Sequence, residues 1–343
     1  MSARKATPTP RGFDNQLAQL EALSASFHAG SPLTAEAIAQ LRGALAHSSN
    51  FIVAKAARLI AEAGLFPLLP DTLAAYDRFF VDAVKNDPQC WAKNALVKTL
   101  VQLEHRQKDA YLRGLRHHQM EPTWGGQSDT AGALRGACTH ALVDCPGITD
   151  ADLLQLLLEP LVDPDKTVRV EAARAFGQVG GSGAALVLRL RALLLPALKA
   201  QEEPEVLGAV YAALLAVEGD RAIPLVAAAL KEGDDTAAEA AFALADRRTP
   251  EALAALMARL RAGADAWFTP VLLSAIALTR LPQAVDFLIS LIERDAREAA
   301  AAIEAFSRIA PGEALLARIA QAIEQADSPR LAQAMREHLS PRP

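Results

Sequence analysis

The stretch DPDKTVRVEAARAFGQVGG, residues 163–181, decides the fold of this 343-residue chain. Its Asp-Pro-Asp start supplies a capping residue and an acidic first turn, both of which favour the N-terminus of a helix. Apolar residues then recur at helical spacing, namely Val168, Ala172, Ala175, Phe176 and Val179. The pair Gly180-Gly181 ends the pattern, as glycine does after the last turn of a helix. The stretch therefore predicts one amphipathic helix with a defined beginning and end.

The same outline returns along the chain, which indicates internal repeats. It is clearest in NFIVAKAARLIAEAG (50–64) and LRGACTHALV (134–143). Positions equivalent to Val168 fall near 52, 92, 134, 168, 206, 236, 270 and 298, and a second apolar helical segment lies between consecutive positions. One helix pair cannot bury its apolar faces, but stacked neighbours form a continuous core. We therefore predict an all-α solenoid of about eight or nine helix pairs over 14–340, preceded by a flexible tail at 1–13.

The repeat resembles HEAT repeats, in particular the short bacterial type named for phycobilisome-lyase proteins. The resemblance is carried by Asp165, Val168, Arg169, Ala172, Ala173, Ala175, Phe176 and Gly180. It covers roughly 34–340 and implies a right-handed superhelix of antiparallel helix pairs, with the second helix of each pair on the concave side. It also implies that Arg135, which occupies the position of Arg169, binds an Asp of a neighbouring repeat.

Composition restricts the class of protein. Hydrophobic residues make up 51% of the chain but aromatic residues only 5%, so the helix-forming residues Ala and Leu carry most of the apolar content. NG and DG hairpin signals between alternating apolar residues are absent, which disfavours a β-rich fold. The net charge of −5 argues against a dedicated nucleic-acid binder. The cysteines Cys90, Cys138 and Cys145 form no CxxC pair and predict reduced, buried thiols.

The chain carries no pattern typical of a secreted or membrane protein. The N-terminal segment lacks the apolar region of a signal peptide, and no apolar run reaches the length of a membrane span. We therefore expect a cytoplasmic protein that does not enter a membrane. The polar last repeat suits a monomer. No recognised zinc spacing such as HExxH occurs, so we expect no metal, no cofactor and no catalytic residue.

One segment, 120–128, exceeds what a repeat requires. Pro122 disfavours helix at the residue before it, and Gly125-Gly126 do not suit a helix, so a long loop is expected before a helix capped at Ser128 or Asp129. Loops on rigid scaffolds often carry function. The candidate binding residues in and around it are Glu121, Trp124, Asp129, Arg135, Arg113, Arg116, His117 and His118. Two interpretations stay open: a site for an anionic or aromatic group, or a loop whose Trp124 folds back as a plug.

These features favour a non-catalytic scaffold or adaptor that binds a protein or peptide through the concave face and the 120–129 loop. The alternative is a nucleic-acid-binding protein, similar to HEAT-like DNA glycosylases, that uses the basic segment 93–118 with Trp124 and Asp129. Its basic residues are Lys93, Lys98, Arg106, Lys108, Arg113 and Arg116. A third hypothesis, a chromophore-lyase-like subunit, rests on the named repeat type alone, and such repeats occur in unrelated proteins.

Overall fold

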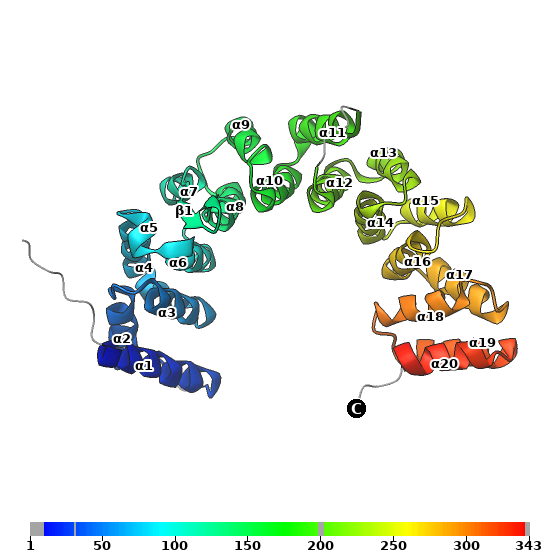
Figure 1. Cartoon of the computed structure of the whole chain (residues 1–343), viewed down its shortest axis with the longest axis horizontal. Helices are drawn as coiled ribbons and strands as arrows, with labels where there is room; N and C mark the ends of the chain where they lie inside the picture. The colour runs from blue at the N-terminus through cyan, green and yellow to red at the C-terminus, as the bar shows by residue number, and fades with distance from the viewer. Residues whose placement is uncertain (1–9, 31, 198–201, 340–343) are drawn as a thin grey trace, which may run out of the picture. The chain divides into compact units, whose positions relative to one another are not determined.

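The computed structural model describes residues 10–30, 32–197 and 202–339 of the chain. Within these ranges the protein is an all-α solenoid of stacked helix pairs, interrupted by one short β-hairpin (Figure 1). The chain divides into two compact units, Met1–Ala172 (unit 1) and Ala173–Pro343 (unit 2). The division falls inside helix α10 (Lys166–Val179).

In unit 1 the helices alternate between two rows, A and B (Figure 1). Row A contains α2 (Ala35–Leu45), α4 (Leu69–Arg78), α7 (Lys108–Leu115) and α9 (Asp150–Leu161). Row B contains α1 (Pro10–His28), α3 (Asn50–Glu62), α6 (Trp91–Gln102) and α8 (Gly132–Ala141). The connections contain α5 (Ala83–Asn86), the 3-10 turns η1 (Phe66–Leu68), η2 (Pro88–Cys90) and η3 (Leu142–Asp144), and strands β1 (Met120–Thr123) and β2 (Gly126–Asp129). Each row B helix packs against the next, as α3 does on α6 and α6 on α8.

Unit 2 repeats this plan. Row A contains α11 (Gly181–Ala197), α13 (Ile223–Ala228), α15 (Pro250–Arg261), α17 (Pro282–Glu293) and α19 (Glu313–Ala326). Row B contains α12 (Pro204–Glu218), α14 (Asp235–Arg247), α16 (Phe268–Leu278), α18 (Ala299–Ser307) and α20 (Pro329–His338). Two 3-10 turns, η4 (Gly219–Ala222) and η5 (Ala229–Lys231), flank α13. The predicted repeat starts from 52 to 270 fall in the first turns of α3, α6, α8, α10, α12, α14 and α16, and 298 is the residue before α18. This agreement confirms the repeat, with α10 as the row B helix shared by the two units.

The packing follows from the small residues of the repeat. Val168, Ala172 and Phe176 of the template helix are fully buried. In unit 2, helices α10 and α12 approach so closely that a Cβ on Gly177 would lie 2.9 Å from the Cβ of Ala213. The dense contact of aliphatic side chains is what stabilises stacked pairs that have no core of their own. No helix among the described residues is long and apolar enough to cross a membrane.

The N-terminal boundary differs from expectation. Helix α1 begins at Pro10, so residues 10–13 of the expected tail are helical, and residues 1–9 lie outside the described ranges. Helix α1 packs on α3 in row B and adds a helix that the repeat pattern did not predict. The buried, unpaired state expected for the three cysteines is confirmed. Burial raises the pKa of Cys138 to about 12, so this thiol is not a nucleophile at neutral pH.

The 120–128 segment is a β-hairpin and not the irregular loop expected from its glycines. Strand β1 pairs antiparallel with β2 in a register that joins Met120 to Asp129 and Thr123 to Gly126. The two residues at the tip are Trp124 and Gly125, and Gly125 adopts a positive φ of 91° that glycine allows without strain. The strands are short and mostly polar, so they lack the alternating apolar pattern by which a hairpin is recognised in a sequence.

Candidate functional site

The base of the hairpin is anchored by a buried carboxylate, Glu121. Its side chain is 9% exposed, and one oxygen, Oε1, accepts three hydrogen bonds. The donors are the Gln89 backbone N–H at 2.6 Å, the Gln119 amide at 2.6 Å and the Thr130 hydroxyl at 2.7 Å. Burial alone would raise the pKa of Glu121, but these bonds and the charge of Lys93 lower it overall. Glu121 therefore holds the hairpin on unit 1. Its negative charge is stabilised by hydrogen bonds and by Lys93 within the fold.

Asp129 closes the other strand. Its Oδ1 accepts the backbone N–H groups of Gln119 and Ala131, both at 3.0 Å. Its Oδ2 lies 2.8 Å from Nδ1 of His118 and 2.7 Å from a guanidinium nitrogen of Arg135. Burial would by itself raise the pKa of Asp129, but the backbone bonds, His118 and Arg135 outweigh it and hold the pKa well below its usual range. With both oxygens occupied, Asp129 is poorly placed to act as a general base.

Arg135 joins the hairpin to the next repeat. The side chain is 2% exposed and makes a bidentate contact with Asp163, at 2.8 and 2.9 Å, in addition to its bond with Asp129. A further bond reaches the His117 carbonyl oxygen at 3.1 Å. Asp163 lies in the connection after α9, in the neighbouring repeat, so the inter-repeat contact implied by the HEAT resemblance is confirmed for this arginine. Arg135 is a structural residue of the hairpin support and is not exposed to a ligand.

A buried ion pair lies next to the base of the hairpin, at the start of α6. Lys93 and Asp87 are both fully buried, with Nζ and Oδ2 3.0 Å apart. Asp87 also caps α6, because its carboxylate accepts the backbone N–H groups of Ala92 and Lys93 at 2.8 and 3.0 Å. Its own carbonyl oxygen accepts the amide of Gln119 at 2.8 Å. Lys93 therefore does not belong to an exposed basic patch, contrary to the sequence-based prediction.

Asp87 and Gln119 were not among the predicted residues. A signal for Asp87 was present, because Asp87-Pro88 repeats the Asp163-Pro164 dipeptide that opens the template helix. If Asp87 had been interpreted as a helix cap, the sequence would have predicted a carboxylate at the start of α6. No comparable signal exists for Gln119, whose amide joins Asp87 to Glu121 only in the folded chain.

Trp124 stands fully exposed at the tip of the hairpin, with a relative exposure of 105%. The interpretation in which this ring folds back over the solenoid as a plug is therefore wrong. The reason is geometric: the strands pair up to Thr123 and Gly126, so the two-residue tip projects away from the anchored base. The hairpin thus presents an aromatic ring on a support fixed by buried hydrogen bonds.

The other predicted residues are dispersed. Arg113 is half-exposed and pairs with Asp77 on α4 at 2.6 Å, while Arg116 is exposed at the end of α7. His117 lies with Nε2 3.1 Å from the Gln119 amide oxygen, and burial lowers its pKa. The structure brings together Glu121, Asp129, Arg135, His117 and His118 in one network. That network excludes Arg113 and Arg116, and it leaves Trp124 outside as the exposed tip.

A groove lies on the row B face of unit 1, across α1, α3 and α6, with a volume of about 730 Å³. Phe51 and Trp91, 40% and 49% exposed, lie on it with ring centroids 6.2 Å apart. Two cations, Arg58 and Lys98, are exposed along it. The backbone N–H of Gln89 anchors Glu121 at the base of the hairpin. Trp91 lies two residues further along the chain, so this groove begins beside that base.

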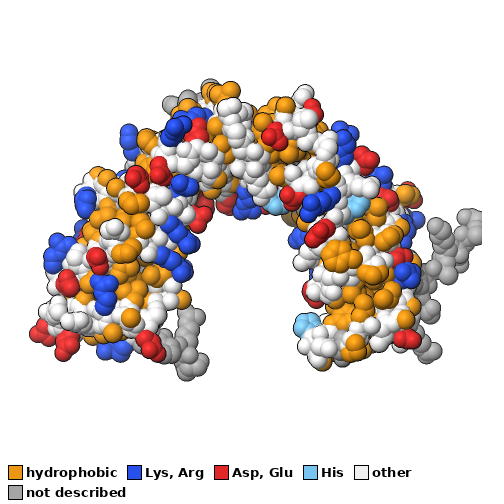
Figure 2. Space-filling model, turned by 180° about the vertical axis from the view of Figure 1, so that it is seen from behind, with side chains coloured by type: hydrophobic (Ala, Val, Ile, Leu, Met, Phe, Trp, Pro, Cys, Tyr) orange, Lys and Arg blue, Asp and Glu red, His pale blue; other side chains and the backbone are white. Residues whose placement is uncertain are grey.

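Asn94 on α6 also lines this groove. Its Oδ1 is buried and has no hydrogen-bond partner among the described residues. A buried acceptor without a partner is costly to the fold. On the face that Figure 2 presents, apolar side chains are exposed in patches among acidic and basic ones.

We expect acid to weaken the hairpin support through Asp129. The pKa of this carboxyl is lower in the folded chain than in the unfolded chain, so the unfolded state binds more protons as pH falls. Its contribution to stability is complete above the unfolded pKa of about 4 and is lost as pH falls toward the folded pKa. Asp129→Asn should therefore give a flatter dependence of the free energy of unfolding on pH below about 5.

Urea unfolding followed by circular dichroism at a series of pH values measures this slope. Trp124→Ala, which keeps every carboxylate of the network, is the control and should run parallel to the parent chain. A parallel curve for Asp129→Asn would contradict the assignment.

The comparisons with known proteins agree with the architecture. None of the curated proteins compared with the chain matches it. The family model described as HEAT repeats matches residues 151–245, a range that contains the template helix α10 and ends in α14. The short phycobilisome-lyase type stays a prediction. The matched segment is therefore similar to HEAT repeats, and helix pairs stack in the same manner on both sides of it.

Proposed function

We propose that this protein is a non-catalytic scaffold whose unit 1 binds a protein partner, with Trp124 as the anchor and the α1–α3–α6 groove as the adjoining surface. The exposure of Trp124 on a rigidly supported tip carries the proposal. HEAT repeats commonly act as protein-interaction scaffolds, which agrees with the family match.

Trp124 has the properties of an interface residue. Trp is enriched at the energetically dominant positions of protein interfaces, because a large rigid ring buries much area and loses few rotamers. The ring of Trp124 buries no surface in the folded chain, since it is fully exposed. The anchored strands restrict the positions that the ring can take, so binding would lose less conformational entropy than it would on a free loop.

The groove suggests the chemistry of the partner. Its exposed aromatic rings, Phe51 and Trp91, suit apolar side chains, and its exposed cations, Arg58 and Lys98, suit carboxylates. Lys55 is already paired with Glu21 at 2.8 Å. We therefore infer a partner segment that carries apolar and acidic side chains together. The groove lies on row B, whose helices come second in each pair, after the row A helix, and the HEAT resemblance assigns the second helix to the concave side.

Trp124→Ala tests the proposal. We expect the recovery of partner proteins to fall by at least about tenfold, because truncation of a dominant interface residue costs 2 kcal/mol or more. The free energy of unfolding should change by less than about 0.5 kcal/mol, because the ring makes no contact in the fold. Quantitative mass spectrometry of proteins that co-purify with the full-length chain from its native cells measures the first quantity, and urea unfolding the second.

The matched control is Trp267→Ala, which removes a half-exposed ring from unit 2. Its set of recovered partners should equal that of the parent chain. Lys98→Glu should reduce the same partners as Trp124→Ala if they are acidic. Equal recovery by Trp124→Ala and the parent chain would reject the proposal.

The nucleic-acid alternative loses two of its residues. Asp129 is hydrogen-bonded on both oxygens, and Lys93 is fully buried with Asp87. A steep loss of DNA affinity with rising salt would support this alternative, and no binding of DNA at low salt would end it.

A further inference from the structure

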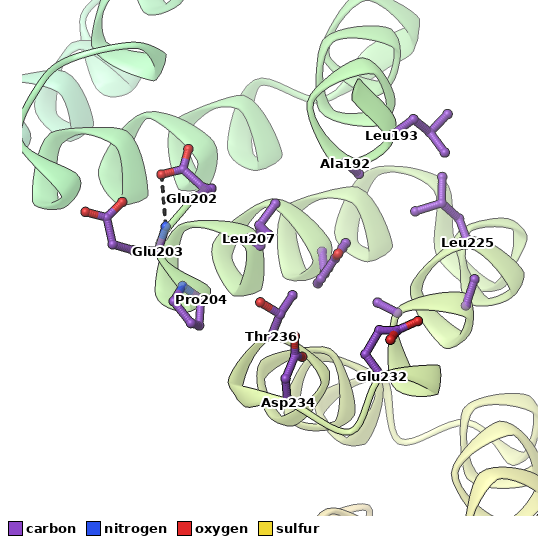
Figure 3. A pocket seen from close by; sticks show the side chains of 13 residues that line it. Ala192, Leu193, Glu202, Glu203, Pro204, Leu207, Leu225, Glu232, Asp234 and Thr236 are labelled. Atoms are coloured by element: carbon purple, nitrogen blue, oxygen red, sulfur yellow. Dashed lines mark hydrogen bonds between the residues drawn. The ribbon is translucent and has the colours of Figure 1, made fainter. Parts of the chain in front are cut away.

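A recess in unit 2 has the form of a small-molecule site. It has a volume of about 930 Å³ and lies among α11, α12, α13 and the start of α14. Figure 3 shows its apolar side chains coming from three helices, with Leu193 on α11, Leu207 on α12 and Leu225 on α13. Ligand sites are mostly apolar recesses of this size that contain a few well-placed polar groups.

One of the polar groups is the hydroxyl of Tyr211. This residue lines the recess and is only 2% exposed, yet its hydroxyl forms no hydrogen bond with any described residue. The other two tyrosines, Tyr76 and Tyr111, are equally buried but donate to the carbonyl oxygens of Ala110 and His105. The hydroxyl oxygen does not belong to the fully buried polar atoms that lack a partner, so it reaches the open space of the recess. The Tyr211 hydroxyl is therefore available to a bound molecule.

The mouth of the recess is negatively charged. Glu232 and Asp234 line it from the connection into α14, and both are exposed (Figure 3). One oxygen of Asp234 caps α14 through the N–H of Ala237 at 2.9 Å. Burial raises the pKa of Tyr211, and the negative charge of Asp234, which lines the same recess, raises it further. Among the described residues that line the recess, none is Lys or Arg.

We propose that this recess binds a small amphipathic cation, a hydrocarbon chain that carries one ammonium group. The hydrocarbon chain of the ligand lies among the leucines of the recess, and its ammonium group lies at the mouth against Glu232 and Asp234. The Tyr211 hydroxyl oxygen accepts a hydrogen bond from it. Opposite charges near a low-dielectric wall attract more strongly than in open water, which selects the cation over a neutral or anionic head group. The site is independent of the partner surface proposed for unit 1.

Three probes that share a ten-carbon chain but differ in their head groups test the charge preference. They are decylammonium, decanol and decanoate. Calorimetric titration of the full-length protein should give the tightest binding for decylammonium. We expect an affinity at least about tenfold above that of decanol, with decanoate weaker still. Equal affinities for the three probes, or no binding of decylammonium up to about 1 mM, would overturn the proposal.

Four substitutions locate the binding. Tyr211→Phe removes only the hydroxyl and should weaken decylammonium binding about three- to tenfold. Glu232→Gln and Asp234→Asn should each reduce the preference for the ammonium head, and Asn preserves the helix cap. Ala228→Trp, at an exposed position that lines the recess, should block binding while leaving the melting temperature of the chain unchanged.

Glu251→Gln, on the exposed face of α15 in the same unit, is the matched control and should bind as the parent chain does. Decylammonium binding that persists in Ala228→Trp would show that the probe lies elsewhere and would reject the site. A helical Leu/Lys peptide that binds in an Ala228-dependent way, while decylammonium does not, would make this recess a protein-docking groove and also reject it.

Discussion

Asp87→Ala is expected to lower the free energy of unfolding by about 3–5 kcal/mol, because removal of one partner leaves a buried charge uncompensated. Lys93 would retain the Phe79 carbonyl oxygen at 3.2 Å and the ring of Phe80, but it would lose the carboxylate with which it pairs. The N-terminus of α6 would also lose its cap on Ala92 and Lys93. Urea unfolding of the full-length chain, followed by circular dichroism, measures the change.

Two controls separate the buried charge from a general effect of substitution. Asp71→Ala removes an exposed pair with Arg42 and should cost less than about 1 kcal/mol. The double variant Asp87→Ala, Lys93→Met removes both charges and should recover part of the loss, since an apolar replacement of a buried pair is often tolerated. A cost for Asp87→Ala equal to that of Asp71→Ala would contradict the role of the pair.

Arg135→Met is the second change with a large expected effect, again about 3–5 kcal/mol. It removes the bidentate contact with Asp163 and the bond to Asp129, so two carboxylates lose their shared cation. The hairpin should open more often, because Asp129 closes its second strand. Urea unfolding measures the first effect, and faster hydrogen exchange across residues 120–129 measures the second.

Arg135→Lys tests the geometry of this contact. A single ammonium group cannot reproduce the planar fork that reaches both oxygens of Asp163, so most of the loss should remain. Arg113→Met, which removes the exposed contact with Asp77, is the surface control and should cost less than about 1 kcal/mol. Full stability of Arg135→Lys would show that charge alone is required there.

The candidate site could be located from the sequence but its parts could not be assigned. Glu121, Asp129 and Arg135 were predicted as binding residues because they carry charge near an unusual segment, although the HEAT resemblance also implied a structural contact for Arg135. In the structure they bind one another and backbone groups. Whether a carboxylate serves a ligand or the fold depends on contacts between residues distant in the chain, such as Arg135 with Asp163.

The sequence by itself determined the repeat, the row B helices and the burial of the template positions, since helical periodicity and caps are local properties. The tertiary structure alone decided that Lys93 is buried, that Trp124 projects into solvent and that the Tyr211 hydroxyl has no hydrogen-bond partner among the residues that the structure describes. The physical reason is that exposure and hydrogen bonding depend on which segments meet. Which segments meet is determined by how the repeats stack on one another, and no short stretch of the chain contains that information.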